Sequence, residues 1–148
     1  MAHIVVVGSS NTDLGGRSRE LPQPGQTVLG GEFQIVPGGK GANQAVAAAR
    51  AGAKVTFVAN IGRDDFGEAA VGRLRTEGID SRYVARSPTA PSGVALILVN
   101  EQGENLISVA RSSNNELTPA QVEAALRPGR RQQPAVVIDR QESNVTHV

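Results

Sequence analysis

Residues 36–52 read VPGGKGANQAVAAARAG, and this stretch decides the fold. Alanine, the best helix former, dominates residues 41–51, and Ala45 and Ala49 fall on one face, which predicts a helix with an apolar side. Gly52 is its expected C-terminal stop, because glycine readily adopts the left-handed conformation that ends helices. The glycines before the helix would let its first turn approach another backbone segment or a ligand closely.

Apolar runs of strand length stand on both sides of this helix. HIVVV at residues 3–7 precedes it and KVTFVANIG at residues 54–62 follows it, each with the β-branched composition of a buried strand. A second helix is expected over residues 64–77, with Asp64 or Asp65 as its N-cap. Because the order of strand and helix occurs twice, the sequence predicts an α/β fold with a parallel-sheet core and helices on its faces.

The other segments predict a second, small and exposed β-sheet. Residues 14–36 have no helical period and include the semi-alternating piece TVLGGEFQIV, while residues 92–100 and 105–110 flank the turn EQGE as a hairpin would. A third helix is expected after Thr118 as N-cap. AVVI at residues 135–138 would add a third buried strand to the core, which makes a three-stranded parallel sheet.

Composition excludes several classes of function. The 148 residues carry a net charge of +1, only 3% are aromatic, and none is cysteine. Scattered charge and few aromatic side chains argue against nucleic-acid binding, and the lack of cysteine excludes disulfides and thiolate metal sites. The start MAHIVVVG is typical of a first strand rather than of a signal peptide, and no apolar run has the length of a membrane span.

The glycine-rich loop does not match the two common phosphate-binding patterns. A P-loop needs glycine where Gln34 stands and a hydroxyl residue where Gly41 stands, and a dinucleotide fingerprint needs glycine at Gln44. A simple flexible turn with Asn43 as a helix cap explains the local pattern as well as a ligand site does. For a ligand, the free N–H groups of the helix start, the Lys40 cation and the Asn43 amide would be available.

The segment SSNTD, residues 9–13, follows the first strand directly. It would lie at the carboxyl edge of the parallel sheet, where open α/β folds bind their ligands. Asn11 and Asp13 are two residues apart in what we expect to be an extended turn, so their side chains can point the same way. An acid and two amides that converge from two segments suit a ligand with many hydroxyl groups.

Three segments resemble the ribokinase-type sugar kinase family: GSSNTDL at residues 8–14, the long stretch at residues 21–53, and IGRDDFG at residues 61–67. The resemblance covers about residues 3–126 well and residues 135–142 loosely. It implies a cytoplasmic enzyme with a central α/β domain and a β-sheet lid, here within residues 14–36 and 92–110. Such a lid closes over a pentose and often joins two subunits in a homodimer.

The resemblance also implies which residues bind the sugar. In the family, the first turn and the Gly-Lys-Gly-Ala-Asn segment hold the sugar hydroxyl groups. The corresponding residues are Asn11, Thr12, Asp13, Gly39, Lys40, Gly41, Ala42 and Asn43. A glutamate after a buried strand is a further family contact, and Glu142 stands at that spacing; the alternative is an exposed loop acid.

The catalytic half of such kinases has no counterpart in these 148 residues. We find neither the Gly-Ala-Gly-Asp motif that supplies the catalytic base nor the Asn-x-x-Glu motif that helps to organise Mg²⁺, so no catalytic or nucleotide-binding residue is assigned. ATP and Mg²⁺ are expected for the full-length enzyme, and this chain alone is expected to be inactive. VARSSNNELTP at residues 109–119 replaces the usual Pro-Gly-Ala-Asn run, which puts that piece of the sugar pocket in doubt.

Two alternatives remain open. The chain could be a non-catalytic remnant that binds sugar or dimerises through its lid, or it could belong to a family kinase for adenosine, fructose or another nucleoside. No metal site is assigned: Asp64 and Asp65 are explained as a helix start, and His3 and His147 have no second ligand nearby in the sequence.

Overall fold

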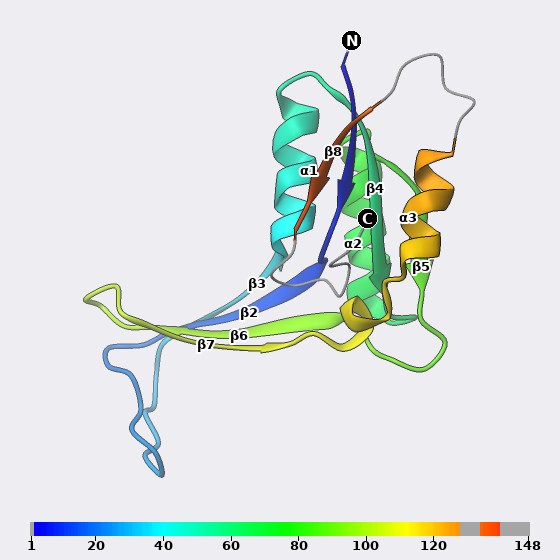
Figure 1. Ribbon diagram of the computed structural model, residues 1–148. Coiled ribbons are helices and arrows are strands. Elements are labelled where there is room, and N and C mark those ends of the chain that lie inside the picture. Colours follow the sequence, from blue (N-terminus) through cyan, green and yellow to red (C-terminus); the bar gives the residue numbers. More distant parts are fainter. Residues whose placement is uncertain (1, 128–133, 140–148) are drawn as a thin grey trace.

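The computed structural model describes residues 2–127 and 134–139, which form two β-sheets and three α-helices (Figure 1). The core sheet is parallel, in the order β5-β4-β1-β8. Its strands are β1 (His3–Val7), β4 (Lys54–Ile61), β5 (Asp80–Arg86) and β8 (Ala135–Ile138). Helices α1 (Lys40–Arg50) and α2 (Asp65–Thr76) cover one face, and α3 (Pro119–Leu126) covers the other.

The second sheet projects from the carboxyl end of the core sheet (Figure 1). Its order is β3-β2-β6-β7, with β2 and β6 parallel and the two outer pairs antiparallel. Its strands are β2 (Asn11–Arg17), β3 (Glu32–Gly38), β6 (Gly93–Val99) and β7 (Asn105–Ala110). A 3-10 helix, η1 (Ser112–Glu116), leads from β7 to α3. This arrangement confirms the predicted fold class, a parallel-sheet α/β core with a small additional β-sheet.

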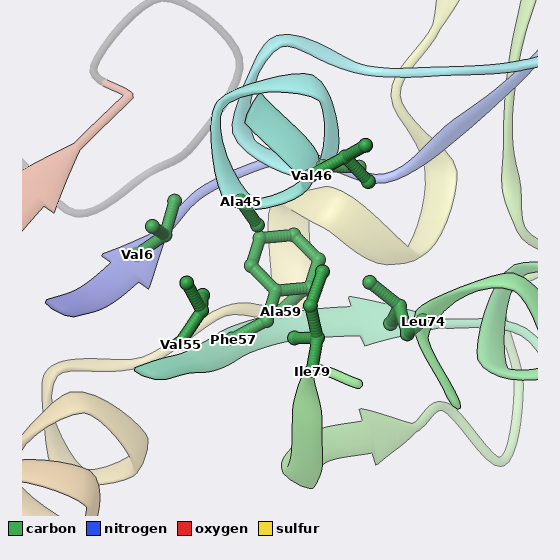
Figure 2. Close-up of a cluster of buried hydrophobic side chains, with 9 residues drawn as sticks. Val6, Ala45, Val46, Val55, Phe57, Ala59, Leu74 and Ile79 are labelled. Carbon is green, nitrogen blue, oxygen red and sulfur yellow. The ribbon is translucent and has the colours of Figure 1, made fainter. Parts of the chain in front are cut away.

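The packing under α1 explains why that helix is rich in alanine. Figure 2 shows the Phe57 ring at the centre of the core, with Ala45 of α1 directly against it and Val6 and Val55 beside it. Phe57 and Ala45 are both fully buried. A small side chain at position 45 lets the helix axis come close to the sheet, and a larger one would push the helix away at a cost of about 1–3 kcal/mol. The core therefore sets the position of the N-terminus of α1.

The predicted starts of α2 and α3 and the predicted end of α1 are confirmed, whereas Asn43 does not cap α1, because its N-cap is Gly39. Asp64 is the N-cap of α2 and accepts a hydrogen bond from the Gly67 backbone N–H at 2.8 Å. Thr118 is the N-cap of α3, where the Gln121 side chain accepts from the Thr118 N–H at 2.8 Å. Gly52, with φ of 90°, follows α1 in the left-handed conformation that the sequence predicted.

Three expectations about strands are wrong. The core has four strands, because DSRYVAR forms β5 although it lacks a continuous apolar run and stays half exposed. Residues 11–13 belong to β2 instead of a turn, since their backbone pairs with β3 and β6. Strand β8 is not buried: Val136 and Val137 are 41% and 38% exposed, because β8 is an edge strand and no described element covers these side chains.

Within residues 2–127 and 134–139, no helix is both long enough and apolar enough to cross a lipid bilayer.

Candidate functional site

The candidate site forms where β1 ends and β2 begins. Gly8 continues the parallel ladder, since its N–H donates to the Val58 carbonyl at 3.1 Å. The next carbonyl, that of Ser9, accepts a hydrogen bond from the Ala42 N–H in the first turn of α1 at 3.0 Å. This bond brings the glycine-rich loop and the SSNTD segment together at the carboxyl edge of the core sheet, as the sequence predicted.

Two glycines make this approach possible. Gly39 has a φ of 91°, and a Cβ there would lie 2.7 Å from the Ser9 carbonyl oxygen. A Cβ on Gly41 would lie 2.7 Å from the Gly8 carbonyl carbon. Both distances are far below any normal contact, so the two backbones touch only because neither residue has a side chain. These glycines thus allow the start of α1 to pack directly against the segment that follows β1. Their role is structural, beyond making the loop flexible.

Asn11 and Asp13 lie on one side of β2. In the ladder, Asn11 is opposite Gly38 and Asp13 is opposite Val36 of β3. The Asp13 carboxylate fills the space that a side chain on Gly38 would need. Thr12 lies on the other face of the strand, because side chains alternate along a strand. The structure therefore brings Asn11 and Asp13 together and separates the Thr12 side chain from them.

The helix start adds polar groups beside this pair. Gly41 and Ala42 are buried against the segment that follows β1, whereas Lys40 and Asn43 are exposed. Lys40 and Asn43 are the first and fourth residues of α1, in its first turn, where backbone N–H groups favour negatively polarised ligand atoms. Glu142, the remaining expected sugar contact, lies outside the described residues.

Asn114 is a buried member of the site that the sequence did not single out. Its side-chain oxygen accepts from the Ser10 N–H at 2.9 Å, and its amide nitrogen donates to Asn11 Oδ1 at 2.8 Å. Asn114 lies in VARSSNNELTP, residues 109–119, the segment that stands where the family usually has Pro-Gly-Ala-Asn.

Asp139 is a second residue that the sequence did not single out. Its side chain is 5% exposed and accepts from Ser9 Oγ at 3.0 Å, while its N–H donates to the Val7 carbonyl at 2.9 Å. Asp139 directly follows β8, so its hydrogen bonds link the end of that strand to Ser9, in the segment that follows β1.

The carboxylate at the start of α2 has a structural role. Burial alone would raise the pKa of Asp64, but hydrogen bonds from the Ser92 hydroxyl and N–H, at 2.6 and 2.7 Å, and from Gly67 hold the pKa below its ordinary value. Asp64 thereby links α2 to the start of β6. The part of the chain that the structure describes contains no group of three His, Cys, Asp or Glu side chains that could hold a metal ion.

A pocket of about 200 Å³ lies between β2, β3, α1 and α2. Apolar side chains form most of its wall, among them Ile35, Val46, Phe66 and Leu74. Thr12 also lines it, on the face of β2 opposite to Asp13. Ser10 and Asn11 line it as well, whereas Asp13 does not, so most of the wall suits an apolar group and only a few polar groups reach it.

Comparison with known proteins gives consistent matches. The model of the pfkB family of carbohydrate kinases matches residues 1–140. A ribokinase of Bacillus subtilis (strain 168) is 46% identical over 120 residues, which are 81% of this chain and 41% of that protein. A ribokinase structure from Giardia lamblia is 36% identical with a TM-score of 0.78, over 85% of this chain and 38% of that one.

A further solved structure is a ribokinase of Arabidopsis thaliana complexed with ribose and ATP. It is 29% identical with a TM-score of 0.77, over 95% of this chain and 46% of that one. This chain thus spans less than half of the length of each of these relatives.

Proposed function

Because the chain belongs to the pfkB family of carbohydrate kinases, we propose that it is the sugar-binding part of a ribokinase-type enzyme. The complete enzyme would transfer a phosphoryl group from ATP to the primary hydroxyl of D-ribose. The observation that carries this proposal is the convergence of Asn11 and Asp13 with the start of α1, held by backbone contact at Gly39 and Gly41.

The chemistry of these side chains suits a pentose. An ionised Asp13 accepts hydrogen bonds only, while Asn11 and Asn43 can both donate and accept, and Lys40 donates. Sugar hydroxyl groups each donate one hydrogen and accept through two lone pairs, so they need both kinds of partner. The relatives include a ribokinase solved with ribose and ATP, which supports ribose over adenosine or fructose as the substrate.

We assign ATP and Mg²⁺ to polypeptide beyond these residues. The 148 residues contain neither Gly-Ala-Gly-Asp nor Asn-x-x-Glu, and the described residues offer no cluster of acids for a metal. We therefore assign no step of phosphoryl transfer to this chain. We propose a cytoplasmic location, where ATP is available to the complete enzyme.

The second sheet is proposed to act as a lid that also joins two copies of the chain. Along one face of the sheet, Ile35, Leu96 and Leu106 are 58%, 55% and 50% exposed, and Phe33 is 68% exposed. Exposed apolar patches of this kind mark protein interfaces. The same observation favours a second candidate function, a non-catalytic subunit that binds sugar and dimerises through this sheet.

Calorimetric titration with D-ribose, with and without ATP, tests the proposal. We expect ribose to bind, ATP to leave the affinity unchanged, and no ribose phosphate to form. Phosphorylation of ribose by the purified chain would contradict the assignment of ATP to other residues. Failure to bind ribose would contradict the sugar site itself.

A further inference from the structure

The buried pair Asn114 and Asn11 carries an inference about sugar selection, which rests on the proposed function. We propose that Asn114 orients the Asn11 amide so that Asn11 donates a hydrogen bond to the sugar, and that this donor selects the hydroxyl pattern that the site accepts. Asn114 is then a positioning residue, and Asn11 is a specificity-determining one.

The orientation of Asn114 follows from partners whose polarity cannot change. A backbone N–H only donates, so the atom of Asn114 that lies 2.9 Å from the Ser10 nitrogen must be its oxygen. A backbone carbonyl only accepts, so the atom 3.0 Å from the Arg111 oxygen must be the Asn114 nitrogen. Asn114 is 2% exposed, so water cannot replace these partners.

The orientation of Asn11 follows in turn. The Asn114 amide nitrogen donates to the Asn11 side chain at 2.8 Å, so the receiving atom is the Asn11 oxygen. The Asn11 NH₂ group is then at the other end of the amide. The two amides and the Ser10 N–H form an aligned chain of dipoles, which strengthens the last donor in the chain.

Gly93 provides the space for this arrangement. It is opposite Asn11 in the parallel pairing of β2 and β6, and a Cβ there would overlap both the Asn114 nitrogen and the Asn11 oxygen. Three elements, β2, β6 and η1, therefore meet on the amide of Asn11.

A donor beside Asp13 completes the set that a diol requires. Residues two apart on a strand are about 6.6 Å apart, so one sugar can reach both side chains. A hydroxyl that gives its single hydrogen to the Asp13 carboxylate can only accept from Asn11. With the Asn11 amide reversed, two acceptors would compete for that hydrogen, and one would stay unpaired at a cost.

Two substitutions reverse the polarity that Asn11 presents. Asn114→Asp offers oxygen to Asn11 and turns its NH₂ group inward. Asn11→Asp keeps the bond from the Asn114 nitrogen and presents a carboxylate oxygen instead of NH₂, so it tests the proposal even where a buried carboxylate at position 114 prevents folding. Asn115→Asp adds the same charge at a neighbouring position and is the matched control.

The readout is the affinity for D-ribose, 2-deoxyribose and 3-deoxyribose, measured by calorimetry on the whole chain. We expect one deoxy sugar to bind at least tenfold more weakly than ribose to the unaltered chain and to N115D. N11D and N114D should each bind ribose at least tenfold more weakly than the unaltered chain does. In both variants, the ratio between the affinities for ribose and for that same deoxy sugar should fall to less than threefold.

Equal weakening of all three sugars in N11D would overturn the inference, because a purely structural role affects every ligand alike. Unchanged ribose affinity in N11D would overturn it as well. Absence of ribose binding by the unaltered chain would contradict the proposed function first, and the inference with it.

Discussion

The carboxylate of Asp13 occupies the space beside Gly38 that any larger residue would fill with its side chain. The two residues are diagonal neighbours in the ladder of β2 and β3, since Gly38 is opposite Asn11 and Val36 is opposite Asp13. The glycines of PGGKG, residues 37–41, thus have two roles: Gly39 and Gly41 allow the backbones to touch, and Gly38 leaves room for the Asp13 carboxylate.

Replacing Gly38 with alanine should displace Asp13. The added methyl group overlaps the carboxylate, so we expect a loss of stability of about 1–3 kcal/mol and at least tenfold weaker ribose binding. The control is Gly72→Ala in α2, where a Cβ meets nothing within 4 Å. That substitution should raise stability by about 0.5–1 kcal/mol and leave ribose binding unchanged. Ribose binding by G38A at the unaltered affinity would contradict the assigned place of Asp13.

Ser112 offers a site for stabilisation. It is the only residue other than glycine with positive φ, at 48°, in the part of the chain that the structure describes. A side chain in the left-handed region costs roughly 1–2 kcal/mol, so Ser112→Gly should raise the free energy of unfolding by up to about 1 kcal/mol once the added chain entropy is counted. Ser108→Gly in β7 should instead lower it. Urea denaturation compares the two, and a less stable S112G would contradict the strain at position 112.

Asp64 should make the free energy of unfolding fall as the pH is lowered. Its pKa is lowered in the folded chain, so its contribution is present above the unfolded pKa of about 3.9 and is lost as pH falls through the folded value. We expect Asp64→Asn to destabilise the chain at pH 7 and the difference to shrink below about pH 4. Asp65→Asn removes the same charge from a neighbouring position and should have a smaller effect. A D64N deficit that is constant from pH 7 to pH 3 would contradict this role.

The second sheet should mediate self-association. Leu96 is 55% exposed on the face of the sheet that also carries Phe33, Ile35 and Leu106, so Leu96→Glu should shift the chain from dimer to monomer by placing a charge in the contact. Gln34→Glu, also exposed but on the opposite face of the sheet, is the control and should leave the dimer intact. Analytical ultracentrifugation over a range of concentrations measures both. An unaltered chain that remains monomeric at all concentrations would contradict the proposed lid dimer.

The sequence predicted those elements in which a whole strand, or one whole face of a helix, is buried. The apolar run at β1 and the alanine face of α1 were identified because burial on both faces of a strand, or on one face of a helix, gives a clear pattern. Strand β5 was missed because its half-buried residues mix charged and apolar types. Asn114 was missed for another reason: its role depends on the meeting of β2 and η1, which are about one hundred residues apart and have no common local pattern.

Titration of D-ribose into the purified 148-residue chain, beside the Asp13→Asn variant, tests the central claim most directly. We expect saturable binding with one sugar per chain, and at least tenfold weaker binding by D13N, because an amide replaces the charged acceptor. Absence of binding by the unaltered chain, or equal affinity of the two proteins, would contradict a sugar site built on Asp13.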